Sequence, residues 1–280
     1  MIYDKYWKAL MWITIAFLVV SVVIVLNNTI TTGSILKKDV DLAGGKVITV
    51  EVDEVDIQRI KSELPYANIH VTSGIRKTLL VEIPFDYDEN EVINKLRAVV
   101  QFSGEPGIRI VGPALGDIFF QQAQMALIAA FVLMSLTVFL LFRTPVPSAI
   151  VLLAAVTDIV GTVAVLSIVG ASLSLPVIGA LLALIGYSVG TDILLTTELL
   201  KSGRSDYRQS ITKAAKTGLT LTATALIALF VMFLLSGSAV IEQIALVMMI
   251  GLIIDMPATW FANAGIMRVW LDRKNKGVSQ

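Results

Sequence analysis

The sequence predicts an α-helical membrane protein in which six transmembrane helices carry a ferredoxin-like α+β domain between the first and second helices. Hydrophobic residues make up 56% of the 280 residues, and the mean hydropathy of +0.80 is far above that of soluble proteins. Apolar stretches of about 20 residues also recur, and each is long enough to cross a hydrocarbon core of roughly 30 Å. Together these observations indicate a multi-pass membrane protein.

The apolar stretches divide the chain into five parts. We predict an N-terminus over 1–8, a first transmembrane helix over 9–27, the α+β domain over 28–120, a five-helix bundle over 121–267 and a basic tail over 268–280. The spans of the bundle are predicted over 122–142, 147–169, 176–197, 217–235 and 243–266. The first helix is interpreted as an anchor, because its apolar run is too long for a signal peptide and no small-residue cleavage site follows it.

Charge is sorted along the chain, although the formal net charge is zero. The segment 28–120 holds 10 Lys and Arg against 14 Asp and Glu, whereas basic residues cluster at the termini and in two short loops. Six alternating spans place these clusters on one side, which the positive-inside rule identifies as the cytoplasm. We therefore predict a cell-membrane protein with both termini cytoplasmic and residues 28–120 outside. The clustered residues are Lys5, Lys8, Arg143, Lys201, Arg204, Arg208, Lys213, Lys216, Arg268, Arg273, Lys274 and Lys276.

The 28–120 domain is predicted to fold in the order βαββαβ. Strands are expected over 46–52, 68–72, 78–83 and 107–112, and helices over 53–64 and 88–102. Pro65 and Pro84 end two of these elements, Ser73-Gly74 separates the second and third strands, and Asp88 is a good N-cap for the second helix. This order is that of ferredoxin-like domains, which support many functions and so identify none.

Three aspartates, Asp158, Asp192 and Asp255, lie well inside predicted spans. A carboxylate at the bilayer centre costs about 2.5–3.5 kcal/mol, so each acid is interpreted first as part of an ion or proton path. Hydrogen bonding to a neighbouring Ser or Thr is the structural alternative for each. Asp192 is the strongest candidate because Gly186 and Gly190 before it have the GxxxG spacing that lets another helix approach, and Thr191 adds a hydroxyl.

The fifth span offers polar residues that can support Asp192. Thr220 and Thr224 share one face at i, i+4, and we expect that face to point inward, although ordinary helix–helix hydrogen bonding is an equal alternative. Lys216, at the cytoplasmic end, is the base positioned to reach a carboxylate. A lysine that only extends its charge to the membrane surface is the alternative for Lys216.

No enzymatic activity is predicted. Gly186-Tyr-Ser188-Val-Gly190 matches the G-x-S-x-G pattern, but this serine lies in a predicted membrane helix and the lone His70 lies in the outside domain. An intramembrane aspartyl protease would carry Gly-x-Gly-Asp, where this chain has Val189-Gly-Thr-Asp192. His70 has no second metal-type ligand at a suitable spacing, and no nucleotide-binding motif occurs. The charge balance gives no case for nucleic-acid binding.

Several motifs resemble segments of the SecD/SecF family of protein-export proteins, in the RND superfamily. Asp41-Leu-Ala-Gly44-Gly45 with the apolar strand after it resembles the start of that family's first extracytoplasmic domain. Val111-Gly112-Pro113-Ala-Leu-Gly116 resembles the segment that precedes the second span. Ile185-Gly186-Tyr-Ser188, followed by Asp192, Glu198 and Lys201, is similar to the fourth span of the SecF branch, and the overall resemblance is to the archaeal type.

The resemblance implies an accessory export subunit that pairs with SecD and works with a SecYEG-type channel, an exported unfolded polypeptide and membrane lipid. It implies no cofactor other than a coupling ion, a proton or sodium, with Asp192 as the main titrating group and Asp158 and Asp255 as supports or relay sites. Lys216, or less readily Lys213, is nearest to the arginine that bacterial relatives carry in the fifth span. A stand-alone RND-type transporter of a small hydrophobic substrate and a non-energised translocon scaffold remain as alternatives.

Overall fold

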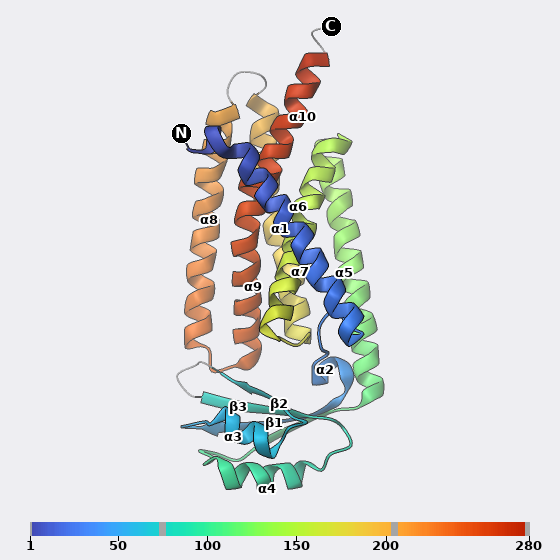
Figure 1. Cartoon of the computed structure of the whole chain (residues 1–280), viewed down its shortest axis with the longest axis vertical. Coiled ribbons are helices and arrows are strands. Elements are labelled where there is room, and N and C mark those ends of the chain that lie inside the picture. Colours follow the sequence, from blue (N-terminus) through green and yellow to red (C-terminus); the bar gives the residue numbers. More distant parts are fainter. Residues whose placement is uncertain (1, 73–76, 203–206, 278–280) are drawn as a thin grey trace.

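The computed structural model describes residues 2–72, 77–202 and 207–277 (Figure 1). It confirms an α-helical membrane protein with a small antiparallel sheet domain. That domain lies at one end of the helical bundle, and the first and last helices begin and end at the opposite end (Figure 1). The predicted turn at Ser73-Gly74 and the predicted cytoplasmic Arg204 lie outside the described residues.

Six helices within the described ranges are long and apolar enough to cross a membrane, in the order predicted. The first five are α1 (Ile2–Thr32), α5 (Pro113–Phe142), α6 (Pro145–Val169), α7 (Leu175–Ser202) and α8 (Tyr207–Leu235). The sixth is one continuous helix in three parts, α9 (Ala239–Pro257), the π-helical turn η1 (Ala258–Asn263) and α10 (Ala264–Gly277). The sequence predicts a regular transmembrane helix here, and the π-helical turn differs from that prediction.

Local sequence signals set the ends of the bundle helices. Pro113 and Pro145 begin α5 and α6, where the missing amide hydrogen of proline is not needed. Gly170 ends α6 in the left-handed conformation, with φ of 77°. These signals leave short connections, so α5, α6 and α7 follow one another as antiparallel neighbours.

The centre of the bundle is formed by α6 and α7, which pack against α9. More than half of the membrane-spanning residues of α6 and of α7 are buried, whereas only about a tenth or less of those of α5 and α8 are buried. The first helix, α1, crosses the bundle obliquely and packs on α6 and η1 (Figure 1). The outward surfaces of α1, α5 and α8 carry large apolar side chains, as expected of surfaces that face lipid.

The sheet domain has the predicted βαββαβ order. Its elements are β1 (Gly45–Val52), α3 (Ile57–Glu63), β2 (Asn68–Val71), β3 (Lys77–Ile83), α4 (Glu89–Val99) and β4 (Gly107–Val111). The strands pair antiparallel in the order β2-β3-β1-β4. Alternate residues such as Ile48 and Val81 point to one face, where they form a core with Ile60 of α3 and Leu96 of α4.

Both helices of the sheet domain are shorter than predicted. The first, α3, begins at Ile57 rather than at residue 53, because the Asp56 side chain accepts hydrogen bonds from the amides of Gln58 and Arg59 and so fixes the N-cap there. The second, α4, ends at Val99. Phe102, predicted as its last residue, instead forms an isolated bridge with Val52.

Glycines hold the sheet domain against the bundle. A short helix that the sequence did not predict, α2 (Val40–Ala43), packs on the start of α5. A β-carbon on Gly44 would lie 2.6 Å from the Pro113 Cα, and one on Gly116 would lie 2.7 Å from the Gly44 amide nitrogen. The two predicted motifs, one containing Gly44 and Gly45 and the other Gly112, Pro113 and Gly116, therefore meet in a backbone-to-backbone contact.

The loop before α7 is also tied to the sheet domain. The amide of Leu173 donates to the Lys37 carbonyl at 2.7 Å, and the amide of Asp39 donates to the Leu173 carbonyl at 2.9 Å. These bonds join the segment that leads into the domain to the segment that leads into α7.

Candidate functional site

The three membrane aspartates lie together in one buried site. Asp158 of α6 is 1% exposed, and Asp192 of α7 and Asp255 of α9 are 0% exposed. Their helices pack against one another at the centre of the bundle. Acids that the sequence places almost 100 residues apart therefore belong to one network.

Thr259 links Asp192 to Asp255. Its hydroxyl oxygen lies 2.9 Å from Asp192 Oδ1 and 3.0 Å from Asp255 Oδ1. A hydroxyl has one hydrogen to donate, so Thr259 shares it between the two acids as a three-centre bond or donates it to one of them at a time. The geometry therefore joins the two acids through one hydroxyl.

Ser188 and Thr191 extend the network to the third acid. The Ser188 hydroxyl donates to Asp158 Oδ2. The Thr191 hydroxyl lies 2.7 Å from the Ser188 carbonyl oxygen and 3.3 Å from Asp255 Oδ2. The acids are thus hydrogen bonded to neighbouring hydroxyls, and the same hydroxyls connect them across three helices.

Asn263 makes the shortest contact with Asp192. Its Nδ2 donates to Asp192 Oδ1 at 2.5 Å, and the residue is 2% exposed. Both Asn263 and Thr259 lie on the π-helical turn η1, which follows Pro257. Because proline has no amide hydrogen, the regular ladder is broken at this point of the helix. Single π-helical turns of this kind occur frequently at functional sites.

The predicted residues of the fifth span do not face this site. Lys216, Thr220 and Thr224 are exposed on α8, and each threonine hydroxyl bonds to a carbonyl of its own helix four residues earlier. The expectation that Thr220 and Thr224 point inward is therefore wrong. The inward face carries Gly218 instead, because the Trp260 ring packs so closely that a β-carbon on Gly218 would lie 2.3 Å from its Cζ2.

No ion pair joins Lys216 to Asp192 in the described ranges. Lys213, the second candidate base, pairs with Glu198 at 3.1 Å. The base expected beside the acid is therefore not provided by the fifth span, which places its lysines on the outer surface of α8.

The fourth span presents two different faces. Thr191 is buried in the network, where its hydroxyl contacts Asp255 rather than the neighbouring Asp192. Gly186 and Gly190 lie on the outward face of α7, and nothing lies within 4 Å of a β-carbon built on either. Among the residues that the structure describes, no other backbone packs against Gly186 or Gly190.

Sequence reasoning missed three residues of the site. The sequence motifs place Ser188 in a G-x-S-x-G pattern and in a family segment but not beside an acid, and they contain neither Thr259 nor Asn263. A signal for the last two was present: Asp255, Thr259 and Asn263 recur at i, i+4 and i+8 in an otherwise apolar span, which places their side chains on one helix face.

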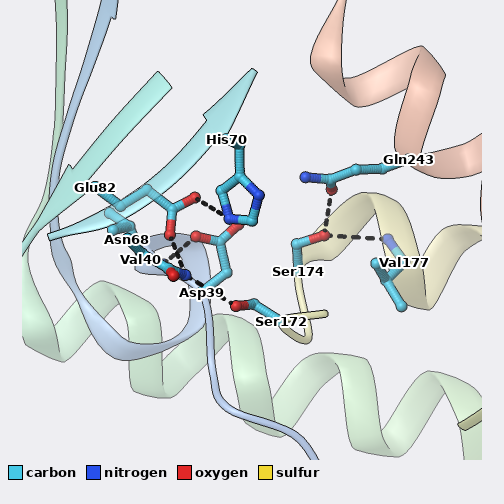
Figure 2. Close-up of polar contacts among 9 residues, drawn as sticks. All are labelled: Asp39, Val40, Asn68, His70, Glu82, Ser172, Ser174, Val177 and Gln243. Atoms are coloured by element: carbon cyan, nitrogen blue, oxygen red, sulfur yellow. Dashed lines mark hydrogen bonds and ion pairs between the residues drawn. The ribbon is translucent and has the colours of Figure 1, made fainter. Parts of the chain in front are cut away.

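A second polar cluster lies where the sheet domain meets the bundle (Figure 2). Glu82 of β3 is buried, accepts a hydrogen bond from Asn68 Nδ2 at 3.3 Å and lies 3.9 Å from His70 Nε2. Asn68 also donates to Ser172 Oγ in the loop before α7, at 3.1 Å. Burial, followed by the hydrogen bond to Asp39 and its charge, raises the pKa of Glu82 to about 9. Burial lowers the pKa of His70, so both side chains are uncharged at neutral pH and their contact is not an ion pair.

Substituting Glu82 by Gln is expected to remove a loss of stability at alkaline pH. A group whose pKa is raised by folding stabilises the folded state fully below its unfolded value, and this contribution is lost as the pH rises toward about 9. Between pH 7 and 9 the wild-type domain should therefore lose up to roughly 1.4 kcal/mol per pH unit, and Glu82→Gln should be nearly flat. Hydrogen exchange of the β3 amides in the detergent-solubilised chain measures this free energy.

The pH window isolates Glu82 from its neighbours. The pKa of His70 is lowered from 6.5, so the charge of His70 does not change between pH 7 and 9. Asp41, whose pKa is raised mainly by burial and lowered by Arg109, is present in both proteins and therefore cancels in the comparison. Equal slopes for wild type and variant would show that Glu82 does not titrate in this range.

Comparison with known sequences identifies the family. A sequence profile described as "Protein export membrane protein SecD/SecF, C-terminal" matches residues 91–273. The "Protein-export membrane protein SecF" of Pyrococcus furiosus is 36% identical over 265 residues, which cover 91% of this chain and 88% of the relative. The protein of the same description from Methanothermobacter thermautotrophicus is 35% identical, covering 96% of this chain and 94% of the relative.

Comparison with solved structures supports the fold. A crystal structure of SecDF, a translocon-associated membrane protein from Thermus thermophilus, superposes with a TM-score of 0.78 at 19% identity. The match covers 96% of this chain and 38% of that longer chain. SecDF in a super-membrane-facing form superposes with a TM-score of 0.63 at 20% identity. With the profile match and the SecF relatives added, these findings show that the chain belongs to the SecD/SecF family of protein-export membrane proteins.

Proposed function

We propose that this chain is a SecF-type subunit that acts with SecD and uses the ion-motive force to assist the translocation or release of exported proteins. The observation that carries the proposal is the buried network of Asp158, Asp192 and Asp255, joined by hydroxyls in the middle of the bundle. Intramembrane acids are costly and mark ion or proton paths. A network of acids that takes up and releases the coupling ion can favour one helix arrangement when loaded and another when empty.

The outward face of α7 supports a partner within the membrane. Gly179, Gly186 and Gly190 have open space where a β-carbon would lie, so a second helix can approach the α7 backbone closely. The SecDF chain from Thermus thermophilus is more than twice as long as the part that this chain matches. We infer that SecD supplies the helix that covers this face.

The charge distribution supports the orientation. With basic clusters and both ends of the described chain at the end of the bundle away from the sheet domain (Figure 1), the positive-inside rule places the termini in the cytoplasm and the sheet domain outside. The domain is then on the side where an exported polypeptide emerges from a SecYEG-type channel. Membrane lipid surrounds the apolar outer helices, and the coupling ion is a proton or sodium.

Export of a secreted reporter protein, in cells with and without this chain, tests the proposal. The chain should accelerate export while the ion gradients are intact and should have no effect after ionophores collapse them. Equal acceleration in both conditions would instead indicate a non-energised scaffold. A chain that leaves export unchanged, and that purifies with itself but without SecD and the channel, would indicate a stand-alone transporter of a small hydrophobic substrate.

A further inference from the structure

A cavity lies between the sheet domain and the bundle, beside the polar cluster of Glu82. Its volume is about 230 Å³, which is below the roughly 300–1,000 Å³ of pockets that hold drug-sized molecules, so it suits a single side chain. Asp39 and His70 line it from the domain side, and Gln243 of α9 lies opposite them (Figure 2). Apolar residues of the bundle form much of the remaining wall, among them Leu166, Val177, Leu246 and Val247.

A second cavity, of about 140 Å³, continues from the first, because His70, Gln243 and Leu246 line both. It extends past Val71 and Thr72 to the first turn of α9. The two cavities therefore form one groove along β2, which is an edge strand in the order β2-β3-β1-β4. An edge strand offers backbone groups to which an extended polypeptide can pair, and pockets beside the strand hold alternate side chains of that polypeptide. The groove has this arrangement.

Asp39 gives the first cavity a negative charge. It is 7% exposed, and its Oδ1 accepts a hydrogen bond from the Val40 amide at 2.5 Å. The neighbouring Glu82 keeps its proton at neutral pH, because burial raises its pKa to about 9, and it hydrogen bonds to Asp39. The two acids together therefore hold one negative charge, on the side of the cavity that Asp39 lines.

The bases around Asp39 are engaged elsewhere. The Nζ of the adjacent Lys38 lies over the Phe120 ring of α5, 3.7 Å from its centroid. Arg109 pairs with Asp41, the next acid along the chain, at 2.6 Å. In the ranges that the structure describes, no lysine or arginine forms an ion pair with Asp39. A buried charge is costly unless it is paired, so the cavity favours a ligand that brings a cation.

We propose that this groove binds the exported polypeptide and takes one of its lysine side chains into the cavity, with the ammonium group on Asp39. The inference rests on the proposed function, because it names the feature of the exported chain that the sheet domain recognises. Lysine fits both parts of the cavity, since its methylene stem can lie along apolar walls such as Leu246 while its ammonium group donates to a carboxylate. An acidic side chain would be repelled by Asp39, and an apolar one would leave its charge unpaired.

Peptide binding to the full-length chain in a non-ionic detergent tests the groove without measuring export. The probe is a fluorescein-labelled peptide of serine and threonine residues with one central lysine, and its matched partner carries acetyl-lysine at that position. Acetylation keeps the stem and removes the charge. Because hydrogen bonds to charged groups are the stronger ones, the lysine peptide should bind about tenfold more tightly, as measured by fluorescence anisotropy. Equal affinities for the two peptides would overturn the proposal.

Matched variants assign the charge to Asp39. Asp39→Asn should reduce the ratio of the two affinities from about ten to about one, whereas Asp86→Asn, which removes an exposed acid of the same domain, should keep it. Each ratio is taken within one protein, so a partly unfolded preparation lowers the signal and leaves the ratio unchanged. A preference for lysine that survives in Asp39→Asn would contradict the proposed contact.

A second pair of variants locates the peptide in the groove. Leu246→Trp places a large ring where the two cavities meet, so it should weaken the binding of both peptides about tenfold or more. Ile241→Trp makes a similar change at an exposed position of the same helix and should leave both affinities unchanged. Unchanged binding by Leu246→Trp would place the peptide outside the groove.

The peptide result and the export result are separable, because peptide binding needs no ion gradient. Equal binding of both peptides, combined with gradient-dependent export, would leave the proposed function standing and overturn the lysine site. A preference for lysine, combined with export that ignores every gradient, would confirm the site and contradict the coupling to an ion. A preference that is present in the chain alone and lost in its complex with SecD would assign the groove to SecD and overturn the proposal.

Discussion

Replacing Asp192 with Asn is expected to abolish the part of protein export that depends on the ion gradient. Asparagine keeps the size of the side chain and an oxygen that can accept from Thr259 and Asn263, but it can neither hold a charge nor exchange a proton. One elementary charge moved across 100 mV supplies about 2.3 kcal/mol, which corresponds to a factor of about fifty in a rate or an equilibrium. Reporter export in cells with intact gradients should therefore fall to the level seen after ionophore treatment.

Asp117→Asn is the matched control for this substitution. Asp117 is an exposed acid near the start of α5, away from the network, so its loss should leave export unchanged. Thermal melting of both variants in detergent should match wild type, which separates a loss of coupling from a loss of folding. Wild-type export by a folded Asp192→Asn variant would show that Asp192 is not the coupling group.

Substituting Gly116 by Ala is expected to weaken the attachment of the sheet domain to the bundle. The new β-carbon would lie 2.7 Å from the Gly44 amide nitrogen and 3.1 Å from the Ala43 carbonyl carbon. These are backbone atoms, which cannot rotate away as the end of a side chain can. Forcing extra volume into such a contact costs roughly 1–3 kcal/mol, a large share of a typical stability of about 5–15 kcal/mol. Hydrogen exchange of the amides around α2 and the melting temperature of the chain measure the effect.

Gly112→Ala provides the control within the same motif. Gly112 has nothing within 4 Å of a built β-carbon, and its φ of −66° is open to any residue. The substitution weakens an N-cap position, which costs less than about 1 kcal/mol. Melting temperatures that fall equally for Gly116→Ala and Gly112→Ala would contradict the contact between the two motifs.

The fold was largely predictable because its signals are local. Apolar length defines the spans, and alternating apolar residues with Pro and Asp at element ends define the sheet domain. The errors concern side chains whose partners decide the outcome. Asp53 and Asp56 are both good N-cap residues, and only the hydrogen bonds of Asp56 select the start of α3.

The site was only partly predictable, because the packing of neighbouring helices decides which face of a helix points inward. Thr220 and Thr224 have the spacing of an inward polar stripe, but the Trp260 ring occupies the surface of α8 at Gly218 and turns that stripe outward. Helical periodicity identifies residues that share a face and does not identify which face is inside. The cost of a buried carboxylate is independent of this ambiguity, so the three aspartates could be identified from sequence, whereas which hydroxyl contacts which acid could not.

The hydrogen bonds of Leu173 allow α7 to transmit a small rotation to the sheet domain. From Asp192 to the start of α7 at Leu175 is about 25 Å of rigid helix at 1.5 Å per residue. A tilt of about 3° around Asp192 moves that far end by more than about 1 Å, enough to strain hydrogen bonds of 2.7 and 2.9 Å. Since those bonds join α7 to the segment entering the sheet domain, an angular change too small to disturb the packed centre of the bundle becomes a linear displacement at the membrane surface.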